Sequence, residues 1–260
     1  MAEDLLTLAM VQADIVWNQV SVNLERIDQL LGTIGEAVDV VVLPETFATG
    51  FITKPDPQVP DRTGEVVRWM ANKARQMDAM IMGSHASRLG AKMANRLFAV
   101  KPDGEVLHYD KRHLFTMGGE DLHFERGESP LLIEFRGWKL FPLICYDLRF
   151  PVWSRNVHGY DLLIYVANWP HVRRIVWDTL VPARAIENQS YALGVNRIGP
   201  DTHGTAHSGG SQLVSPEGEL LLRMDGSEGV AVKRISRTAL LKLRERFPVL
   251  RDADGFRLGA

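Results

Sequence analysis

Apolar and amphipathic runs alternate along the first third of the chain. Short runs rich in apolar residues over 5–12, 38–44 and 79–87 predict strands, and the run 38–44 is typical of a strand buried on both faces. Between them, residues 18–31 and 64–77 place apolar side chains at helical spacing. The order strand, helix, strand, helix, strand predicts parallel strands joined by helices, as in α/β proteins.

Two predicted hairpins share the same turn chemistry at different places in the chain. Residues 95–100 turn into residues 105–109 through Lys-Pro-Asp-Gly, and residues 210–214 turn into residues 219–224 through Ser-Pro-Glu-Gly. In both turns proline fixes φ at the second position and glycine closes the turn. The repeated pattern indicates a pseudo-twofold internal symmetry.

The remaining patterned segments complete the predicted architecture. Further strands are expected over residues 138–145, 160–168 and 190–196, and further helices over 152–156, 172–187 and 237–247. No linker rich in Gly, Ser or Pro divides the chain. We therefore predict one domain over residues 1–260, an α/β fold built as a four-layer αββα sandwich with helices outside two stacked sheets.

Composition and charge narrow the class of protein. Hydrophobic residues make up 45% of the chain and charged residues 24%, which is ordinary for a globular protein. The net charge is −2, from 30 basic and 32 acidic side chains that are interspersed, so we expect no nucleic-acid partner. No apolar segment is long enough for a membrane helix, and the acidic N-terminus does not fit a signal peptide. We expect a cytoplasmic protein with no membrane partner.

Three chemically active side chains come at the ends of predicted strands. Glu45 follows the run 38–44, Lys111 follows the strand of the first hairpin, and Cys145 ends an apolar run. The carboxyl ends of strands are where α/β sheets place their sites, and a thiol there can face a helix N-terminus, which favours the thiolate. A lone cysteine is more often a packing residue, and each charge alone fits an ordinary strand end. The three together indicate a catalytic constellation.

Several short motifs surround these residues or follow them along the chain. They are Leu43-Pro44-Glu45, the runs 109–115, 145–151, 167–170 and 183–188, and Asn196-Arg197. Over nearly the whole chain this set resembles the nitrilase, or carbon–nitrogen hydrolase, superfamily. The resemblance implies the αββα fold of that superfamily. The runs 110–115 and 145–156 are most similar to bacterial ω-amidases, which hydrolyse the amide of 2-oxoglutaramate.

The hydrolysis of an amide needs a nucleophile, a proton-transfer group and a stabiliser of the oxyanion. We expect Cys145 to attack the amide carbon and form a thioester. Glu45 is expected to take the thiol proton, deliver it to the departing ammonia, and later activate water. Lys111 is expected to stabilise the oxyanion with the backbone N–H of Tyr146, and its charge favours the thiolate.

Other residues are candidates for the walls of the site. A second glutamate often joins this site in the superfamily, and the chain offers Glu120 or Glu125. Either one is otherwise an ordinary acidic side chain in a solvated loop. Phe115 and Trp169 are expected to line the substrate pocket, although large aromatic residues are more often part of a core.

Arg149 bears on the class of substrate. Its guanidinium can bind a substrate carboxylate through a bidentate contact, or it can pair with Asp147 or Glu187 for structural reasons. We predict an amidase for a small ω-amide, 2-oxoglutaramate or 2-oxosuccinamate, that releases ammonia and a dicarboxylic acid. The alternative is an amidase for another small amide, such as deaminated glutathione, and after that a nitrilase.

Two other hydrolase chemistries use residues of the same chain. A cysteine–histidine hydrolase would use His113 as the base in place of Glu45, but the resemblance places Lys111, not His113, at the essential position. His203 and His207 stand four residues apart, as in some zinc motifs, but in a Gly-rich segment without the helix or nearby carboxylate of such motifs. We expect neither a metal nor a cofactor.

Two further matters are an alternative, non-enzymatic role and the oligomeric state. The same fold can serve a binding protein, although such a protein would more commonly have lost one of the three active residues. The resemblance implies a homodimer. Residues 247–260 form a tail that we expect to pack on the partner subunit.

Overall fold

The computed structural model describes residues 4–54 and 61–257, and its strands form two six-stranded sheets. The strands of the first sheet are β1 (Leu5–Gln12), β2 (Val40–Val42), β3 (Met80–Leu89), β4 (Lys92–Val100), β5 (Val106–Asp110) and β14 (Gly229–Ser236). Those of the second are β6 (Ile133–Phe135), β7 (Trp138–Ile144), β8 (Leu162–Ala167), β9 (Tyr191–Asn196), β12 (Gln212–Val214) and β13 (Leu220–Arg223). A small separate sheet pairs β10 (Ile198–Pro200) with β11 (Ala206–Ser208).

The two large sheets have the same topology. Three consecutive strands run parallel in each, β1-β2-β3 in the first and β7-β8-β9 in the second. The last of the three pairs with an antiparallel hairpin, β4-β5 or β12-β13. The first of the three pairs with one antiparallel strand, β14 or β6. The predicted pseudo-twofold symmetry is therefore confirmed at the level of strand order.

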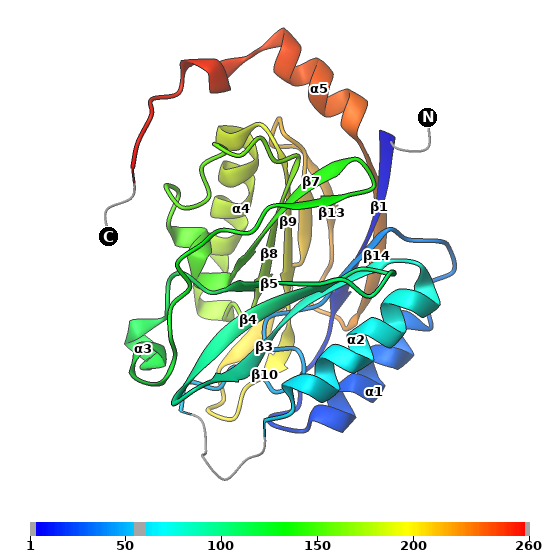
Figure 1. Cartoon of the computed structure of the whole chain (residues 1–260), viewed down its shortest axis with the longest axis vertical. Coiled ribbons are helices and arrows are strands. Elements are labelled where there is room, and N and C mark those ends of the chain that lie inside the picture. Colours follow the sequence, from blue (N-terminus) through cyan, green and yellow to red (C-terminus); the bar gives the residue numbers. More distant parts are fainter. Residues whose placement is uncertain (1–3, 55–60, 258–260) are drawn as a thin grey trace.

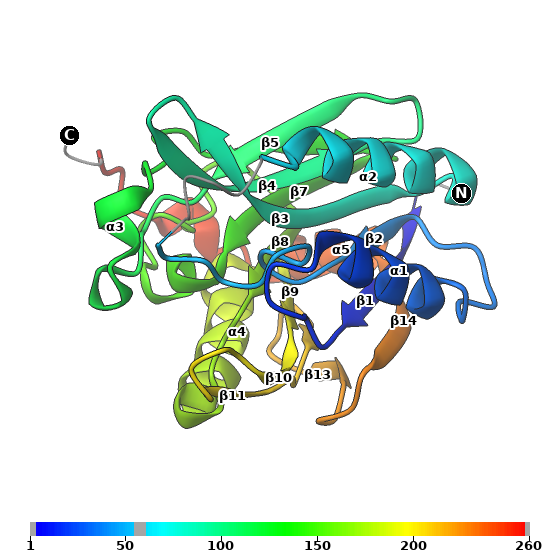
Figure 2. The ribbon, with the colours of Figure 1, turned by 90° about the horizontal axis from the view of Figure 1, so that it is seen from below.

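Helices cover the outer faces of both sheets (Figures 1 and 2). The first sheet is covered by α1 (Val20–Leu31) and α2 (Thr63–Met77), and the second by α4 (Arg174–Asn188). The last α-helix, α5 (Arg237–Arg246), follows β14 and leads into the C-terminal segment of the chain. The predicted αββα sandwich is confirmed. Within the described residues, no helix has the length and apolar character needed to span a membrane.

Successive residues of β1 alternate between two hydrophobic cores. Leu8 and Met10 face the second sheet, in the core that also contains Leu140. Ala9 and Val11 belong to the core formed with α1 and α2. Because the middle of β1 is buried on both faces, residues 8–11 are continuously apolar rather than alternating.

The segment 152–156, predicted as a helix, forms turns instead. The helical turn lies just before it, as the 3₁₀ helix η3 (Cys145–Arg149). The backbone N–H of Asn156 donates to the side chain of Asn188, at 2.9 Å, rather than to a carbonyl one turn earlier. The helical turn of η3 therefore does not continue into a helix over residues 152–156.

Short and long-range elements were missed by the sequence analysis. The strands β6, β10 and β11 span three residues each, and the helix α3 (Glu120–His123) spans four. β14 pairs along the whole length of β1, from the other end of the chain. Three more 3₁₀ helices are η2 (Thr116–Gly118), η4 (His171–Arg173), which precedes α4, and η5 (Val249–Asp252).

Candidate active site

The carboxyl ends of β2, β5 and β7 bring three side chains together where the two sheets meet. Glu45 follows β2 and Lys111 follows β5, both in the first sheet, whereas Cys145 follows β7 in the second. Glu45 and Lys111 are 0% and 1% exposed, and Lys111 Nζ donates to Glu45 Oε1 at 3.0 Å. Cys145 lines the same cavity as Glu45 and Lys111. All three residues that the sequence singled out therefore lie in one cluster.

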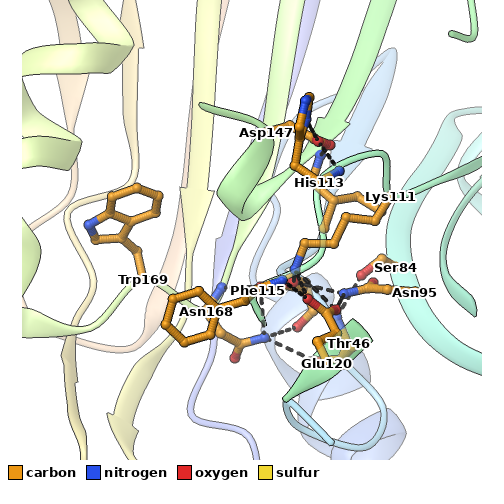
Figure 3. A network of polar contacts seen from close by, with 12 residues as sticks. Thr46, Ser84, Asn95, Lys111, His113, Phe115, Glu120, Asp147, Asn168 and Trp169 are labelled. Carbon is orange, nitrogen blue, oxygen red and sulfur yellow. Dashed lines mark hydrogen bonds and ion pairs between the residues drawn. The ribbon is translucent and has the colours of Figure 1, made fainter. Parts of the chain in front are cut away.

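Glu120 joins this cluster from the start of α3 (Figure 3). Lys111 Nζ lies 3.2 and 3.0 Å from its two carboxylate oxygens, and the backbone N–H of Phe115 donates to Oε2 at 2.7 Å. Glu125 is exposed and pairs with Lys92 at 3.2 Å. The structure thus places Glu120, rather than Glu125, beside the lysine.

The backbone at Cys145 adopts an uncommon conformation. Its φ is +42°, a region that residues other than glycine rarely occupy. Cys145 is the first residue of η3, where β7 turns sharply out of the sheet. Strain of this kind persists only where the surroundings fix it, and it gathers at functional sites.

Asp147 ties the turn that carries Cys145 to the loop that follows Lys111. Its buried carboxylate accepts hydrogen bonds from the backbone N–H groups of Ile144 and His113, both at 3.0 Å, and from the Tyr109 hydroxyl at 2.8 Å. His113 Nδ1 also lies 2.8 Å from this carboxylate (Figure 3). In the described part of the chain His113 makes no hydrogen bond to the thiol, so the geometry does not support it as the base.

Burial and nearby charges determine the protonation states in the cluster. Burial and the negative Glu45 raise the pKa of Cys145 well above its ordinary value, although Lys111 lowers it. Burial also raises the pKa of Glu45, but Lys111 and the backbone N–H of Asn168 lower it by more. Burial lowers the pKa of Lys111, but Glu120 and Glu45 outweigh this and raise it. At neutral pH the site therefore holds a protonated thiol beside an ionised carboxylate.

A cavity of about 480 Å³ opens onto Cys145, within the size range of small-molecule sites. Four residues expected near the substrate line it: Phe115, Tyr146, Arg149 and Trp169. The guanidinium carbon of Arg149 lies 5.3 Å from the centre of the Trp169 ring, and that of Arg173 lies 5.3 Å from the Phe115 ring. Two cationic groups therefore rest on aromatic walls of the same cavity.

The structural partners considered for Arg149 are engaged elsewhere. Asp147 accepts the hydrogen bonds described above, and Glu187 pairs with Arg184 at 3.0 Å. Within the described residues Arg149 has no ion pair with an acidic side chain. The interpretation of Arg149 as a structural partner of these two acids is therefore wrong.

Three residues of the site were missed by the sequence analysis. Asn168 donates through its backbone to Glu45 Oε2 and through its side chain to the Glu45 carbonyl, both at 2.8 Å. Its place at the end of β8 was a signal for it, as for Glu45. Arg173 comes from η4, and Asn95 lies inside β4, where no sequence pattern marks it.

The two histidines considered for metal binding, His203 and His207, line the same cavity. Nδ1 of His207 lies 3.2 Å from the carbonyl oxygen of Gly199. Among the described residues, no group of three or more His, Cys, Asp or Glu side chains is arranged to hold a metal ion. The pair therefore lacks the further ligands of a metal centre.

Comparison with known proteins identifies the family. The carbon–nitrogen hydrolase family model matches residues 7–244. The chain belongs to the carbon–nitrogen hydrolase family. This carbon–nitrogen hydrolase is 44% identical over 255 residues to the omega-amidase YafV of Escherichia coli K12, covering 97% of this chain and 98% of the relative. It is 31% identical over 253 residues to a 2-oxoglutaramate amidase of Bacillus subtilis, covering 95% and 96%.

A solved structure shows the same fold for this carbon–nitrogen hydrolase. XC1258 from Xanthomonas campestris is a CN-hydrolase superfamily protein with an arsenic adduct in its active site. It matches with a TM-score of 0.94 and 38% identity, over 98% of this chain and 99% of that one. The nitrilase type of the sandwich is confirmed, and the protein is a hydrolase of amide carbon–nitrogen bonds.

Proposed function

We propose that the protein hydrolyses the ω-amide of a small α-keto acid, 2-oxoglutaramate or 2-oxosuccinamate, to ammonia and a dicarboxylic acid. The observation that carries this substrate class is Arg149, whose guanidinium is held against Trp169 in the cavity that contains Cys145. A planar guanidinium matches a carboxylate through two parallel hydrogen bonds. The names of the relatives from Escherichia coli and Bacillus subtilis support the same class.

In the proposed acylation, Cys145 attacks the amide carbon while Glu45 takes the thiol proton. The raised pKa of Cys145 means that proton transfer accompanies attack. The negative charge that develops on the amide oxygen is stabilised by the Lys111 ammonium and the backbone N–H of Tyr146. Glu45 then gives its proton to the amide nitrogen, the carbon–nitrogen bond breaks, and ammonia leaves a thioester on Cys145.

In the proposed deacylation, the same carboxylate acts on water. Glu45 accepts a proton from a water molecule as that water attacks the thioester carbon, and the new oxyanion occupies the same locus beside Lys111. Collapse of the intermediate breaks the carbon–sulfur bond. The proton on Glu45 returns to the sulfur, so the acid product leaves and the thiol is restored.

A homodimer, a cytoplasmic location and a single domain over residues 1–260 stay predictions. Exposed apolar side chains support a subunit interface on the outer side of the second sheet: Val172, Ile175 and Ile186. Ile175 and Ile186 lie about three turns apart on α4, and so on one face of it. A reducing compartment fits a chain whose single cysteine is proposed to act as a thiol.

A panel of amides tests the proposed substrate class through the ammonia released. The panel contains 2-oxoglutaramate, 2-oxosuccinamate, succinamate, glutamine, asparagine, deaminated glutathione and one nitrile. We expect the two α-keto acid amides to give the highest kcat/KM. A preference for deaminated glutathione or for the nitrile would replace the proposed class with one of its alternatives.

We expect Arg149→Lys to separate anionic from neutral substrates. Lysine keeps the charge but loses the planar pair of donors, so KM for 2-oxoglutaramate should rise at least tenfold, since a hydrogen bond to a charged group contributes on the order of 1.5–3 kcal/mol. A neutral amide of similar length is the control, and kcat/KM is measured for both substrates in both proteins. An equal loss on both substrates would make Arg149 a structural residue.

A further inference from the structure

Asn95 links the two buried glutamates of the site. It lies in β4, is 1% exposed, and its Nδ2 donates to Glu45 Oε1 at 2.8 Å and to Glu120 Oε1 at 3.3 Å. Figure 3 shows the Asn95 amide directed at the cluster formed by Lys111 and Glu120. One neutral side chain thus bonds to both carboxylates.

The main chain of Asn95 also positions the lysine. Its carbonyl oxygen accepts a hydrogen bond from the backbone N–H of Lys111 at 2.9 Å. Asn95 therefore contacts Glu45 and Glu120 through its side chain and Lys111 through its backbone. A shift of this residue would move all three charged groups.

The orientation of the Asn95 amide is imposed by the carboxylates. Its Oδ1 is buried and has no hydrogen-bond partner among the described residues. Turning the amide over would place that oxygen against two carboxylates, which offer no proton when ionised. An unsatisfied buried acceptor lowers stability. Asn95 is therefore held in a geometry that serves the two glutamates rather than its own packing.

The two glutamates and the lysine leave an excess of negative charge, which a neutral donor does not cancel but can stabilise by hydrogen bonding. Two carboxylates and one ammonium share a buried space, and carboxylates in one site compete until one of them binds a proton. Glu45 faces Lys111, Glu120, the Cys145 thiol, and the amides of Asn95 and Asn168. Hydrogen bonds donated to an ionised carboxylate favour that form.

We propose that Asn95 is a positioning residue that keeps Glu45 ionised beside Glu120, so that Glu45 is free to accept the Cys145 proton. The inference rests on the base role proposed for Glu45. It assigns Asn95 an action through the glutamates and no contact with the substrate.

The test is the pH dependence of Cys145 alkylation by iodoacetamide, measured by mass spectrometry. This reaction needs no assumption about the substrate. Its rate should decrease toward low pH where Glu45 gains a proton and can no longer accept one from the thiol, and we call this decrease the acidic limb. We expect Asn95→Ala to move that limb upward by about one pH unit, since a hydrogen bond to a charged group has been lost. At pH values below the shifted limb, alkylation is expected to fall about tenfold.

Asn156 provides the matched control. Its buried side chain also donates two hydrogen bonds, to the carbonyl oxygens of Tyr160 and Asn188, and none to a charged group. Asn156→Ala should lower the melting temperature and leave the acidic limb in place. Circular dichroism checks the fold of both variants, and Asn95→Leu, which keeps the side-chain volume and has no donor, replaces the alanine variant if that variant does not fold.

Glu45→Gln separates this inference from the proposed mechanism. If Glu45 is the base, the acidic limb disappears in Glu45→Gln. An unchanged limb in that variant would overturn the role of Glu45 and the inference with it. A limb that is lost in Glu45→Gln but unmoved in folded Asn95→Ala or Asn95→Leu would overturn the inference on Asn95 alone.

Discussion

We expect Cys145→Ala to abolish ammonia release and to leave the fold intact. Alanine removes the only thiol of the chain and leaves only a small cavity. Rapid quenching of the wild-type enzyme with its substrate, followed by mass spectrometry, should show an acyl group on Cys145. The same measurement on the alanine variant should show no added mass.

Cys145→Ser is the stricter version of this test because serine has almost the same shape as cysteine. The hydroxyl is far harder to deprotonate than the thiol, so turnover should also be lost. Near-normal ammonia release from either variant would show that Cys145 is not the nucleophile. Circular dichroism spectra that match the wild type exclude a folding defect as the cause.

The second large effect is expected for Lys111→Ala. The proposed oxyanion contact acts mainly in the transition state, so the rate of thioester formation should fall by roughly a hundredfold or more while substrate binding changes far less. Single-turnover kinetics with 2-oxoglutaramate measure the two quantities separately. A change confined to KM would make Lys111 a binding residue and would require another electrophile.

Lys111→Ala also leaves two buried carboxylates without their shared cation. Lys111 Nζ contacts both Glu45 and Glu120 at 3.0 Å, and removal of one partner from a buried ion pair is strongly destabilising. Because Lys111 lowers the pKa of Glu45, the pKa of that carboxyl should rise in the variant. Lys111→Met, which keeps most of the side-chain volume, is the control for loss of packing.

Strand ends were the part of the site that the sequence could predict. Glu45 and Cys145 each follow a buried apolar run, and the carboxyl ends of such strands are where α/β proteins place their sites. That the two strands lie in different sheets was not visible in the sequence. Glu120 could not be separated from Glu125 in this way. Which of the two glutamates reaches Lys111 depends on how α3 is placed after η2. A helix of four residues is too short to show a periodic sequence pattern that would reveal this.

Sequence patterns could predict neither the position of Asn95 in the site nor the raised pKa of the Cys145 thiol. Asn95 interrupts a strand with a polar side chain, and such a residue is equally compatible with an exposed strand face. The pKa of Cys145 depends on burial and on the distances to two opposite charges, which arise only when both sheets are in place. The helix predicted over 152–156 was wrong for a similar reason, because the backbone N–H of Asn156 donates to the side chain of Asn188, which lies on a helix distant in the sequence.

The division of the site between two sheets of equal topology affects how activity appears during folding. Glu45 and Lys111 belong to the sheet built around β1-β2-β3, and Cys145 to the sheet built around β7-β8-β9. Neither half, meaning one sheet with its helices, contains both the nucleophile and the base. Recovered amidase activity in a refolding experiment therefore reports the docking of the halves, whereas circular dichroism reports secondary structure formed in either half.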